Sequence, residues 1–398
     1  MIVAGIAAEY NPFHNGHRYH IEETRRLGAT HVAVVMSGHF MQRGEPSLLL
    51  KWNRARAALL GGADLVLELP ASYSLSSAEG FARGAAGVLS ALGCVDMMSF
   101  GAETDDISLL RAAADAVASP EIHSRTGTLL QQGGLSYPAA REQAVLDVFG
   151  ETLASVLRSP NNILAVEYLK ALRLLHSPIR PFAVARKGSA HDAPGGAFSE
   201  ASASYIRGLL RCGEDISPFV PESTLRVLRS CREEGTLFTD PARYELAVLS
   251  RLRGMTAADF ALLPDIAEGL ENRMEAAVLI STGLEELYDT IKTKRYTHSR
   301  IRRLVACAFL GVARDMARGT PPYIRVLGFN GRGQEILKKA KDSARLPLVL
   351  KYSDLHKRSA RARETFALEC RATDQYALLL PRTAPCGLEM TSEIVRVE

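Results

Sequence analysis

Two histidines near the start of the chain have the types and spacing to do chemistry. His14 and His17 enclose Gly16 in a His-x-Gly-His pattern. An imidazole can donate a hydrogen bond to a phosphoryl oxygen, so a pair can stabilise the negative charge that builds up during displacement at a nucleotide α-phosphate. Gly16 lets the backbone approach a ligand closely, because it has no Cβ. The pattern therefore predicts a phosphate-binding site with His14 and His17 as its catalytic residues.

The flanking elements place this pattern where a strand passes into a helix. Residues 2–8 are a short apolar run typical of a buried parallel strand, and residues 18–27 have the pattern of a helix that ends at Gly28. Free N–H groups and the positive dipole end at a helix start favour an anion. Four residues alone are a weak pattern, and two surface histidines beside a chance glycine are the alternative. The strand and helix around them favour the functional interpretation.

Strand and helix patterns alternate through the first hundred residues. Strands are expected at 31–36, 64–69 and 95–100, with helices at 46–60 and 77–92. This alternation predicts an α/β fold, with a Rossmann-like parallel sheet covered by helices on both faces. Ligands bind such sheets beyond the carboxyl ends of the strands. The Gly-x-Gly-x-x-Gly fingerprint is missing from the first turn, which disfavours a nicotinamide enzyme.

Other candidate ligand contacts follow later strands. Gly101 ends the fourth strand and would let a flat base or ribose lie on the backbone. Arg186 and Lys187 end a fifth strand expected at 179–186, where two cations suit nucleotide phosphates. Ser202 opens the next helix, and helix capping explains it as well as phosphate binding does.

Two polar stretches have interpretations that the residues leave open. The connector 36–46, continued by Lys51 and Arg54, is as compatible with ordinary loop structure as with substrate contact. Asn161 and Asn162 begin a helix after a proline, and capping accounts for at least one of them.

The basic residues are concentrated in the last third of the chain. Residues 291–398 hold 22 Lys and Arg against 10 Asp and Glu, whereas the other 290 residues hold 26 against 34. Residues 292–303 contain six cations, no acid and an interleaved tyrosine, the combination that contacts phosphates and stacks on bases. A solvated helix start is the alternative. We predict RNA binding by this segment, through Lys292, Lys294, Arg295, Tyr296, Arg300, Arg302 and Arg303.

Length and composition indicate a globular protein of two or three domains. We expect a catalytic domain at 1–215, a helical region at 216–320 and a small basic α/β unit at 321–398. No apolar run is long enough to span a membrane, and the start of the chain lacks the pattern of a secretory leader. The six cysteines form no Cys-x-x-Cys pair, which indicates a reduced, cytoplasmic protein without a cysteine-built metal site.

Four stretches together resemble one family: residues 9–17, 36–46, 159–162 and 294–297. The chain is similar to the bacterial tRNA(Met) cytidine acetate ligases, which belong to the HIGH-type nucleotidyltransferases. That superfamily carries a Ser-Ser/Thr-x-Ile-Arg element after the fifth strand, and here the element is degenerate, with Ala203 replacing one hydroxyl residue. The resemblance otherwise covers nearly the whole chain.

The resemblance implies activation of acetate with ATP to acetyl-adenylate. Transfer to the exocyclic amine of the wobble cytidine in elongator tRNA(Met) would then give N4-acetylcytidine. The predicted ATP contacts combine positions that the resemblance implies with Lys187 and Ser202 from the chemistry above: Ala7, Ala8, Glu9, Tyr10, Asn11, Pro12, Phe13, His14, Asn15, Gly16, His17, His20, Gly101, Asn162, Arg186, Lys187 and Ser202. Mg²⁺ is expected to offset pyrophosphate charge, with no metal ligand assigned to the protein. No membrane or DNA partner is expected.

Two alternatives remain open from the residues. One is a small-molecule adenylyl- or cytidylyltransferase of coenzyme biosynthesis whose basic tail is incidental. The other is a nucleotide-sensing RNA-binding module without turnover. No residue stands out as the base for the cytidine amine.

Overall fold

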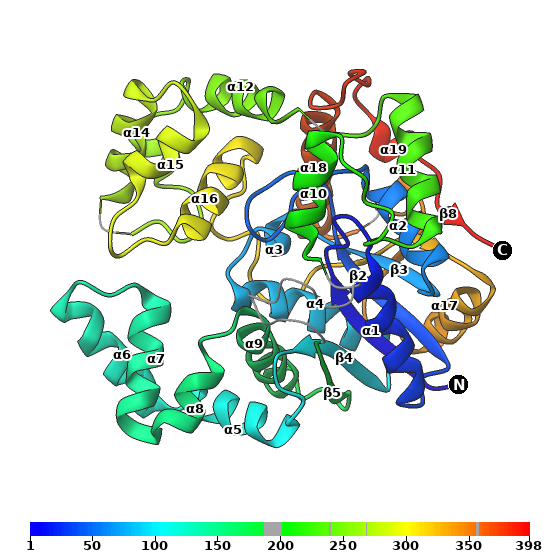
Figure 1. The fold of residues 1–398 in the computed structure, drawn as a ribbon, viewed down its shortest axis with the longest axis horizontal. Coiled ribbons are helices and arrows are strands. Elements are labelled where there is room, and N and C mark those ends of the chain that lie inside the picture. Colours follow the sequence, from blue (N-terminus) through cyan, green and yellow to red (C-terminus); the bar gives the residue numbers. More distant parts are fainter. Residues whose placement is uncertain (187–200, 239, 268, 356–357) are drawn as a thin grey trace.

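Five parallel strands form the centre of the molecule (Figure 1). The computed structural model describes residues 1–186, 201–238, 240–267, 269–355 and 358–398. The strands are β1 (Val3–Ala8), β2 (His31–Ser37), β3 (Leu65–Leu69), β4 (Met97–Ala102) and β5 (Arg180–Ala185). They are ordered β5-β4-β1-β2-β3, and each neighbouring pair is parallel. Every expected strand of this sheet is present within two residues at both ends, and the predicted α/β class is confirmed.

Helices cover both faces of this sheet because its side chains alternate between them. On β2, Ala33 and Val35 pack in the cluster that contains α4 (Ala78–Leu92). Val32 and Val34 point the other way and pack with α2 (Lys51–Leu60). β2 is therefore buried along its whole length, which explains its continuous apolar run.

Two helix starts differ from expectation. Helix α1 (Asn15–Arg26) begins three residues earlier than expected, because His14 is its N-cap. Helix α2 begins five residues later than expected, because Pro46 instead forms an isolated antiparallel bridge with Phe40.

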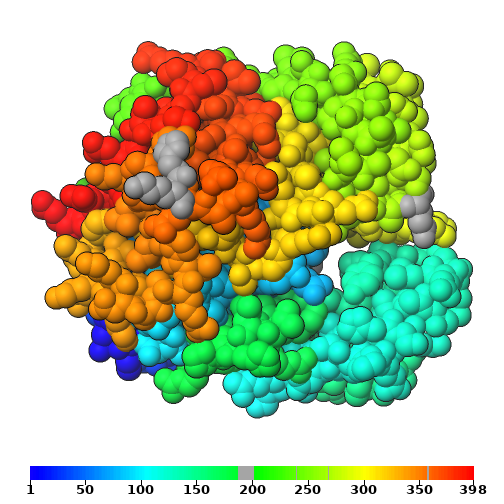
Figure 2. Space-filling view, turned by 180° about the vertical axis from the view of Figure 1, so that it is seen from behind, coloured from blue at the N-terminus to red at the C-terminus, as the bar shows by residue number. Residues whose placement is uncertain are grey.

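Two groups of helices project from the same side of the sheet (Figure 1). The first, between β4 and β5, comprises α5 (Ile107–Ala118), α6 (Pro120–Gln132), α7 (Tyr137–Phe149), α8 (Glu151–Val156) and α9 (Pro160–Leu174). After α10 (Ala203–Cys212) and α11 (Glu222–Glu234), the second comprises α12 (Pro241–Leu252), α13 (Ala257–Phe260), α14 (Leu270–Ile280), α15 (Leu284–Ile291) and α16 (His298–Leu310). Figure 2 shows the surface hollowed between the two groups. Helices α11 to α16 fall within residues 216–320, where a helical region is expected.

The C-terminal segment extends the central sheet. Strand β6 (Ile324–Phe329) pairs antiparallel with β3, and β7 (Leu348–Val349) and β8 (Val395–Arg396) each pair parallel with β6. Helices α17 (Gly331–Ser343), α18 (Ala360–Ala377) and α19 (Leu388–Thr391) complete it, with a 3₁₀ turn at Tyr352–Leu355. The tail thus shares the sheet of residues 1–215. The domain limits at 215 and 320 stay a prediction.

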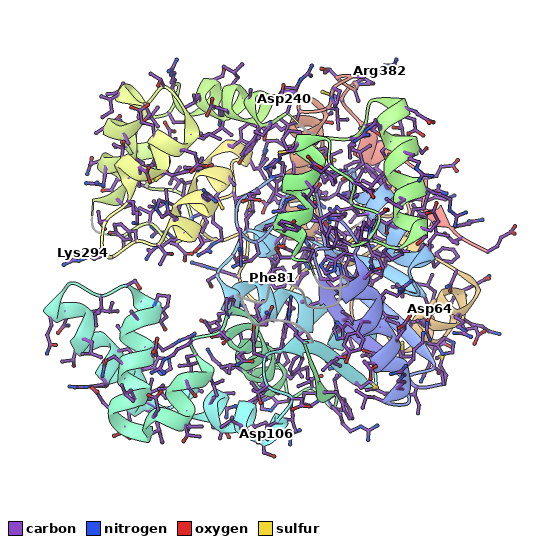
Figure 3. The ribbon with its side chains drawn as sticks, viewed as in Figure 1. Asp64, Phe81, Asp106, Asp240, Lys294 and Arg382 are labelled. Carbon is purple, nitrogen blue, oxygen red and sulfur yellow. The ribbon has the colours of Figure 1, made fainter. Side chains whose placement is uncertain are left out.

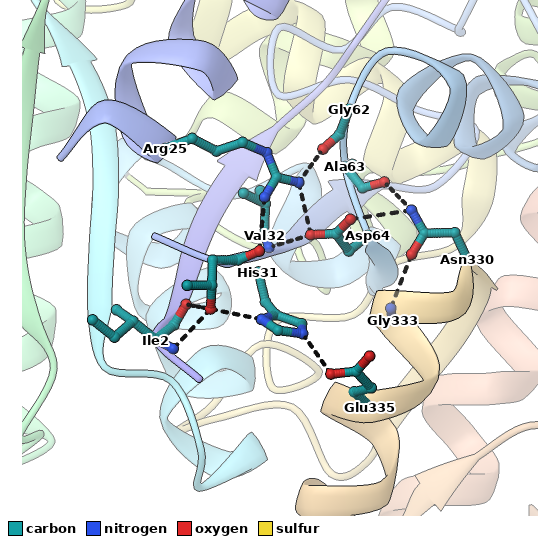
Figure 4. Close-up of polar contacts among 11 residues, drawn as sticks. Ile2, Arg25, His31, Val32, Gly62, Ala63, Asp64, Asn330, Gly333 and Glu335 are labelled. Atoms are coloured by element: carbon teal, nitrogen blue, oxygen red, sulfur yellow. Dashed lines mark hydrogen bonds and ion pairs between the residues drawn. The ribbon is translucent and has the colours of Figure 1, made fainter. Parts of the chain in front are cut away.

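The carboxylate of Asp64 fastens this tail to the amino ends of the strands (Figure 4). It accepts hydrogen bonds from Arg25 Nη2 at 2.8 Å, Val32 N at 2.8 Å and Asn330 Nδ2 at 3.1 Å. Asn330 in turn caps α17 through Gly333 N at 2.9 Å. One buried acid thus joins α1, β2 and α17 at the amino ends of the strands, the end of the sheet opposite the histidines.

Candidate active site

His14 and His17 lie at the start of α1, as the sequence predicts. His14 Nδ1 accepts the backbone N–H of Gly16 at 3.1 Å, and His17 Nδ1 accepts that of His14 at 3.2 Å. Because each neutral ring accepts at Nδ1, its proton is on Nε2. The rings stack with 3.6 Å between centroids. The two Nε2–H groups are therefore a preorganised pair of donors.

Burial keeps these rings neutral. It lowers the pKa of His14 to about 3, and the nearby positive charge of Arg186 acts in the same direction. Burial also lowers the pKa of His17 well below its usual value, helped by His14, His20 and Arg186. Near pH 7 the site therefore offers neutral N–H donors, with Arg186 as its cation.

Gly16 is favoured at this turn for a further reason that the sequence did not reveal. A Cβ there would lie 3.0 Å from His14 Cε1 and 3.1 Å from His14 Nδ1. The missing side chain therefore leaves room for the capping imidazole itself.

His20 lies one turn along α1. Its Nε2 is 2.9 Å from Ser99 Oγ on β4, and Thr24 Oγ1 is 2.7 Å from the same hydroxyl. Burial lowers the pKa of His20 to about 4, again with help from Arg186. This ring therefore fastens α1 to β4, and its predicted contact with ATP stays a prediction.

Gly101 and Arg186 come together on neighbouring strands. A Cβ on Gly101 would lie 3.5 Å from Arg186 Cγ, so the arginine stem passes over the glycine. Arg186 is exposed and makes no ion pair within the described ranges. Its charge influences all three histidines. The structure thus groups Gly101, Arg186 and the histidines, whereas Lys187 lies outside the described residues.

Asn162 is held by Glu103, a residue to which the sequence assigned no role. Asn162 Oδ1 accepts from Glu103 N at 2.9 Å and Thr104 N at 3.3 Å. Glu103 accepts from Asn162 N at 3.0 Å and Asn161 Nδ2 at 2.7 Å. Only the amide NH₂ of Asn162 remains for a ligand. The sequence feature that could have indicated a role for Glu103 was its position directly after the fourth strand.

Several side chains of the first loop contact protein. Tyr10 and Phe13 are buried, with ring centroids 4.9 Å apart. Asn11 Oδ1 accepts from Leu48 N at 2.7 Å, and Asn15 Nδ2 donates to Pro218 O at 3.0 Å. These residues shape the loop, so any contact with ATP would come chiefly from their backbone.

Helix α10 supports the same loop. Ser202 is its exposed N-cap and accepts from Tyr205 N at 3.2 Å, so the capping role is shown and phosphate binding stays a prediction. Arg207 reaches back to donate to Asn11 O at 2.9 Å and to Glu45 Oε2 at 3.0 Å.

Lys51 and Arg54 are buried and bind other parts of the protein. This favours their interpretation as ordinary structural residues over contact with a substrate. Lys51 Nζ lies 2.6 Å from Glu68 Oε1 and also pairs with Glu389 of the tail. Arg54 donates to the backbone oxygens of Glu9 at 2.6 Å and Ser37 at 2.9 Å, and also to Gly38 O. It joins the carboxyl ends of β1 and β2.

Several cations of the basic segment are engaged within the protein. Arg302 pairs with Glu285 at 3.0 Å and Glu45 at 3.6 Å. Arg300 donates to Asp265 O at 2.5 Å and lies over the Tyr296 ring, 5.0 Å from its centroid. These two arginines therefore have partners within the protein. Burial lowers the pKa of Arg303.

Three cations of this segment are exposed: Lys292, Lys294 and Arg295. Figure 3 shows Lys294 at the end of the second group of helices that lies nearest α6 and α7. A cavity of about 410 Å³ lies here, lined by Gly134, Gly269, Leu270, Arg273, Thr293, Lys294, Arg295 and Tyr296. The lining joins the α6–α7 turn to the second group of helices, and it contains no acid.

A parallel sheet whose first strand-to-helix turn carries paired histidines beside an arginine defines a nucleotidyltransferase of the HIGH type. Residues 1–388 match the family described as HIGH Nucleotidyl Transferase. A tRNA(Met) cytidine acetate ligase of Alkaliphilus metalliredigens is 37% identical over 407 aligned residues, covering 96% of each chain. One of Clostridium kluyveri is 38% identical, covering 95% of each chain.

Solved structures agree with these relatives. Thermotoga maritima TmcAL in its apo form I superposes with a TM-score of 0.93 at 32% identity, covering all of both chains. The same protein bound with alpha-thio ATP superposes with a TM-score of 0.91 at 33% identity, again over both complete chains. The present chain belongs to the tRNA(Met) cytidine acetate ligase family of HIGH nucleotidyltransferases.

Proposed function

We propose that this protein is an ATP-dependent ligase that activates acetate as acetyl-adenylate and acetylates the wobble cytidine of elongator tRNA(Met) to N4-acetylcytidine. Family membership supports the reaction. The observation that carries the chemistry is the stacked pair of neutral imidazoles, His14 and His17, at the start of α1 beside Arg186.

In the first step an acetate oxygen attacks the α-phosphorus of ATP, and the bond to the pyrophosphate oxygen breaks. The Nε2–H groups of His14 and His17 donate to α- and β-phosphate oxygens as their charge grows, and Arg186 adds a fixed positive charge. Acetate is a poor acyl donor, so adenylation supplies a leaving group while the enzyme provides alignment. The other proposed ATP contacts are those predicted from the sequence: residues 7–17, His20, Gly101, the Asn162 amide, Lys187 and Ser202.

In this scheme Mg²⁺ would bind together with the triphosphate of ATP. In the described part of the chain, no group of three or more His, Cys, Asp or Glu could hold a metal ion. Mg²⁺ commonly binds through substrate phosphates with few protein ligands. When bound, it would offset the charge of the departing pyrophosphate.

In the second step the tRNA docks on residues 292–303. Exposed Lys292, Lys294 and Arg295 would contact backbone phosphates, and Tyr296 lines the adjacent cavity. Arg300, Arg302 and Arg303 belong to the proposed surface but contribute less, because they are engaged or half-buried within the protein.

We place this activity in the cytoplasm. All six cysteines are free thiols. In the described part of the chain, no helix has the length and apolar character needed to cross a bilayer.

Mass spectrometry of tRNA nucleosides tests the proposal. Elongator tRNA(Met) incubated with enzyme, ATP and acetate should gain N4-acetylcytidine, and omission of either small molecule should prevent it. Acetate-dependent ATP–pyrophosphate exchange should also occur. ATP-dependent nucleotidyl transfer to a small molecule without tRNA acetylation would favour a coenzyme-biosynthesis enzyme, and tRNA binding without turnover would favour a sensing module.

A further inference from the structure

Glu9 is a carboxylate at the carboxyl end of β1, immediately after its last residue, Ala8. Its side chain is half-buried, and Oε1 accepts the backbone N–H of Gln42 at 2.6 Å. Oε2 has no hydrogen-bond partner among the residues that the structure describes. One oxygen therefore fixes the carboxylate, and the other is available to a substrate.

The bond from Gln42 holds this carboxylate toward the connector that follows β2. Gly101 and Arg186 lie on β4 and directly after β5, on one side of β1. Glu9 instead bonds to the connector after β2, the strand on the other side of β1. Gly101 and Arg186 thus lie toward β4 and β5, and the bond from Gln42 holds Glu9 toward β2.

The same connector leads from Glu9 to the basic segment. Glu45 lies 3.6 Å from Arg302. Gly44 packs so closely on that helix that a Cβ would be 2.4 Å from the backbone oxygen of Arg302. Residues 42–45 therefore contact the Glu9 carboxylate at one end and Arg302 of the proposed RNA surface at the other.

We propose that Glu9 is the base that accepts the proton of the cytidine amine during acetyl transfer, an inference that rests on the function proposed above. The N4 nitrogen attacks the carbonyl carbon of acetyl-adenylate, and a C–N bond forms. The bond from that carbon to the AMP oxygen breaks, and AMP leaves with the electron pair. The proton from the nitrogen goes to Glu9 Oε2.

The surroundings of Glu9 suit this role. Burial raises its pKa, while the Gln42 N–H and the charges of Arg54, Arg207 and Arg43 oppose the rise. The Tyr168 hydroxyl of α9, whose own pKa burial raises, is another titratable group near Glu9. A carboxylate with a raised pKa is a better proton acceptor than an ordinary carboxylate.

A single-turnover experiment isolates the transfer step. Enzyme preloaded with acetate and ATP is mixed with elongator tRNA(Met), and the rate constant for N4-acetylcytidine formation is measured against pH. Glu9→Gln keeps an acceptor for Gln42 N and leaves the backbone contact with Arg54 intact. The matched control is Glu22→Gln, which removes an exposed α1 carboxylate that pairs with Arg18.

We expect the transfer rate constant of Glu9→Gln to fall by about 10²- to 10⁴-fold. The wild-type rate should decline as the pH falls through the pKa of Glu9, and the variant should lose this dependence. Glu9→Asp should recover part of the rate, since it keeps a carboxylate. The Glu22→Gln control should match the wild type.

The outcomes distinguish this inference from the proposed function. If the wild type forms no acetyl-adenylate or no N4-acetylcytidine, the proposed function fails. If the wild type transfers acetyl and preloaded Glu9→Gln does so with an unchanged rate constant and pH profile, only the role of Glu9 as base fails. A smaller preloaded fraction with an unchanged rate constant would assign Glu9 to ATP binding alone.

Discussion

Arg54 Nη1 donates to the backbone oxygen of Glu9 at 2.6 Å, although 45 residues separate them. The same guanidinium bonds to Ser37 O at 2.9 Å and to Gly38 O. A single buried side chain thus connects the carboxyl ends of β1 and β2.

Arg54→Lys should therefore damage both stability and activity. An ammonium cannot reproduce the planar fork that meets several carbonyl oxygens, and the lost bonds leave buried acceptors unpaired. We expect the free energy of unfolding in urea to fall by about 3 kcal/mol. Arg56→Lys, at an exposed position on the same helix, is the control and should change it by less than about 0.5 kcal/mol. Equal stability of the two variants would contradict the role of Arg54.

Replacing His14 should remove adenylation without removing tRNA binding. His14→Asn keeps a side chain that caps α1 but loses the Nε2–H donor, so the effect on chemistry is separated from the effect on folding. Acetate-dependent ATP–pyrophosphate exchange should fall by about 10²- to 10³-fold. Binding of tRNA, measured by filter retention, should be unchanged. His123→Ala, at an exposed position on α6, should match the wild type in both assays.

The buried histidines should make stability depend on pH. In the unfolded chain a histidine takes up a proton near pH 6.5. In the folded protein the pKa is about 3 for His14 and about 4 for His20. The unfolded state therefore binds more protons between these values, so stability falls as the pH is lowered from about 6.5 toward 4.

Urea denaturation at pH 7, 6 and 5 measures this dependence. A variant that combines His14→Asn with His20→Gln should lose part of the slope, because those groups no longer titrate on unfolding. An identical slope in the variant would show that other residues cause it.

Charge reversal at the exposed part of the basic segment should weaken tRNA binding and leave adenylation intact. Lys292→Glu with Lys294→Glu is preferable to changing Arg302, whose loss would also break its pairs with Glu285 and Glu45. Each lost phosphate contact should reduce the slope of log K against log salt concentration by about 0.7 to 0.9.

A matched charge reversal elsewhere distinguishes an effect of this surface on tRNA binding from an effect of the net charge. Lys338→Glu with Lys339→Glu changes two exposed cations of α17, on the opposite side of the molecule in Figure 1. This control should retain most of the affinity for tRNA. Equal weakening by both pairs of substitutions would indicate that net charge, and not residues 292–303, governs binding.

Local patterns in the sequence were sufficient for the central sheet and for the position of His14 and His17. Buried parallel strands are short apolar runs, and a helix start selects residues that can cap it, so both leave a trace within a few residues. The basic segment was visible for the same reason, since its charge is concentrated in twelve residues.

Only the tertiary structure decided which polar groups face a ligand. Lys51 and Glu389 pair across 338 residues, Arg302 pairs with Glu45, and β6 joins the sheet antiparallel to β3. In the sequence each of these side chains is simply a polar residue. Whether it stabilises the fold or stays available to a ligand depends on a partner far along the chain. Because burial and long-range pairing depend on how elements pack together, no local spacing of residues specifies them.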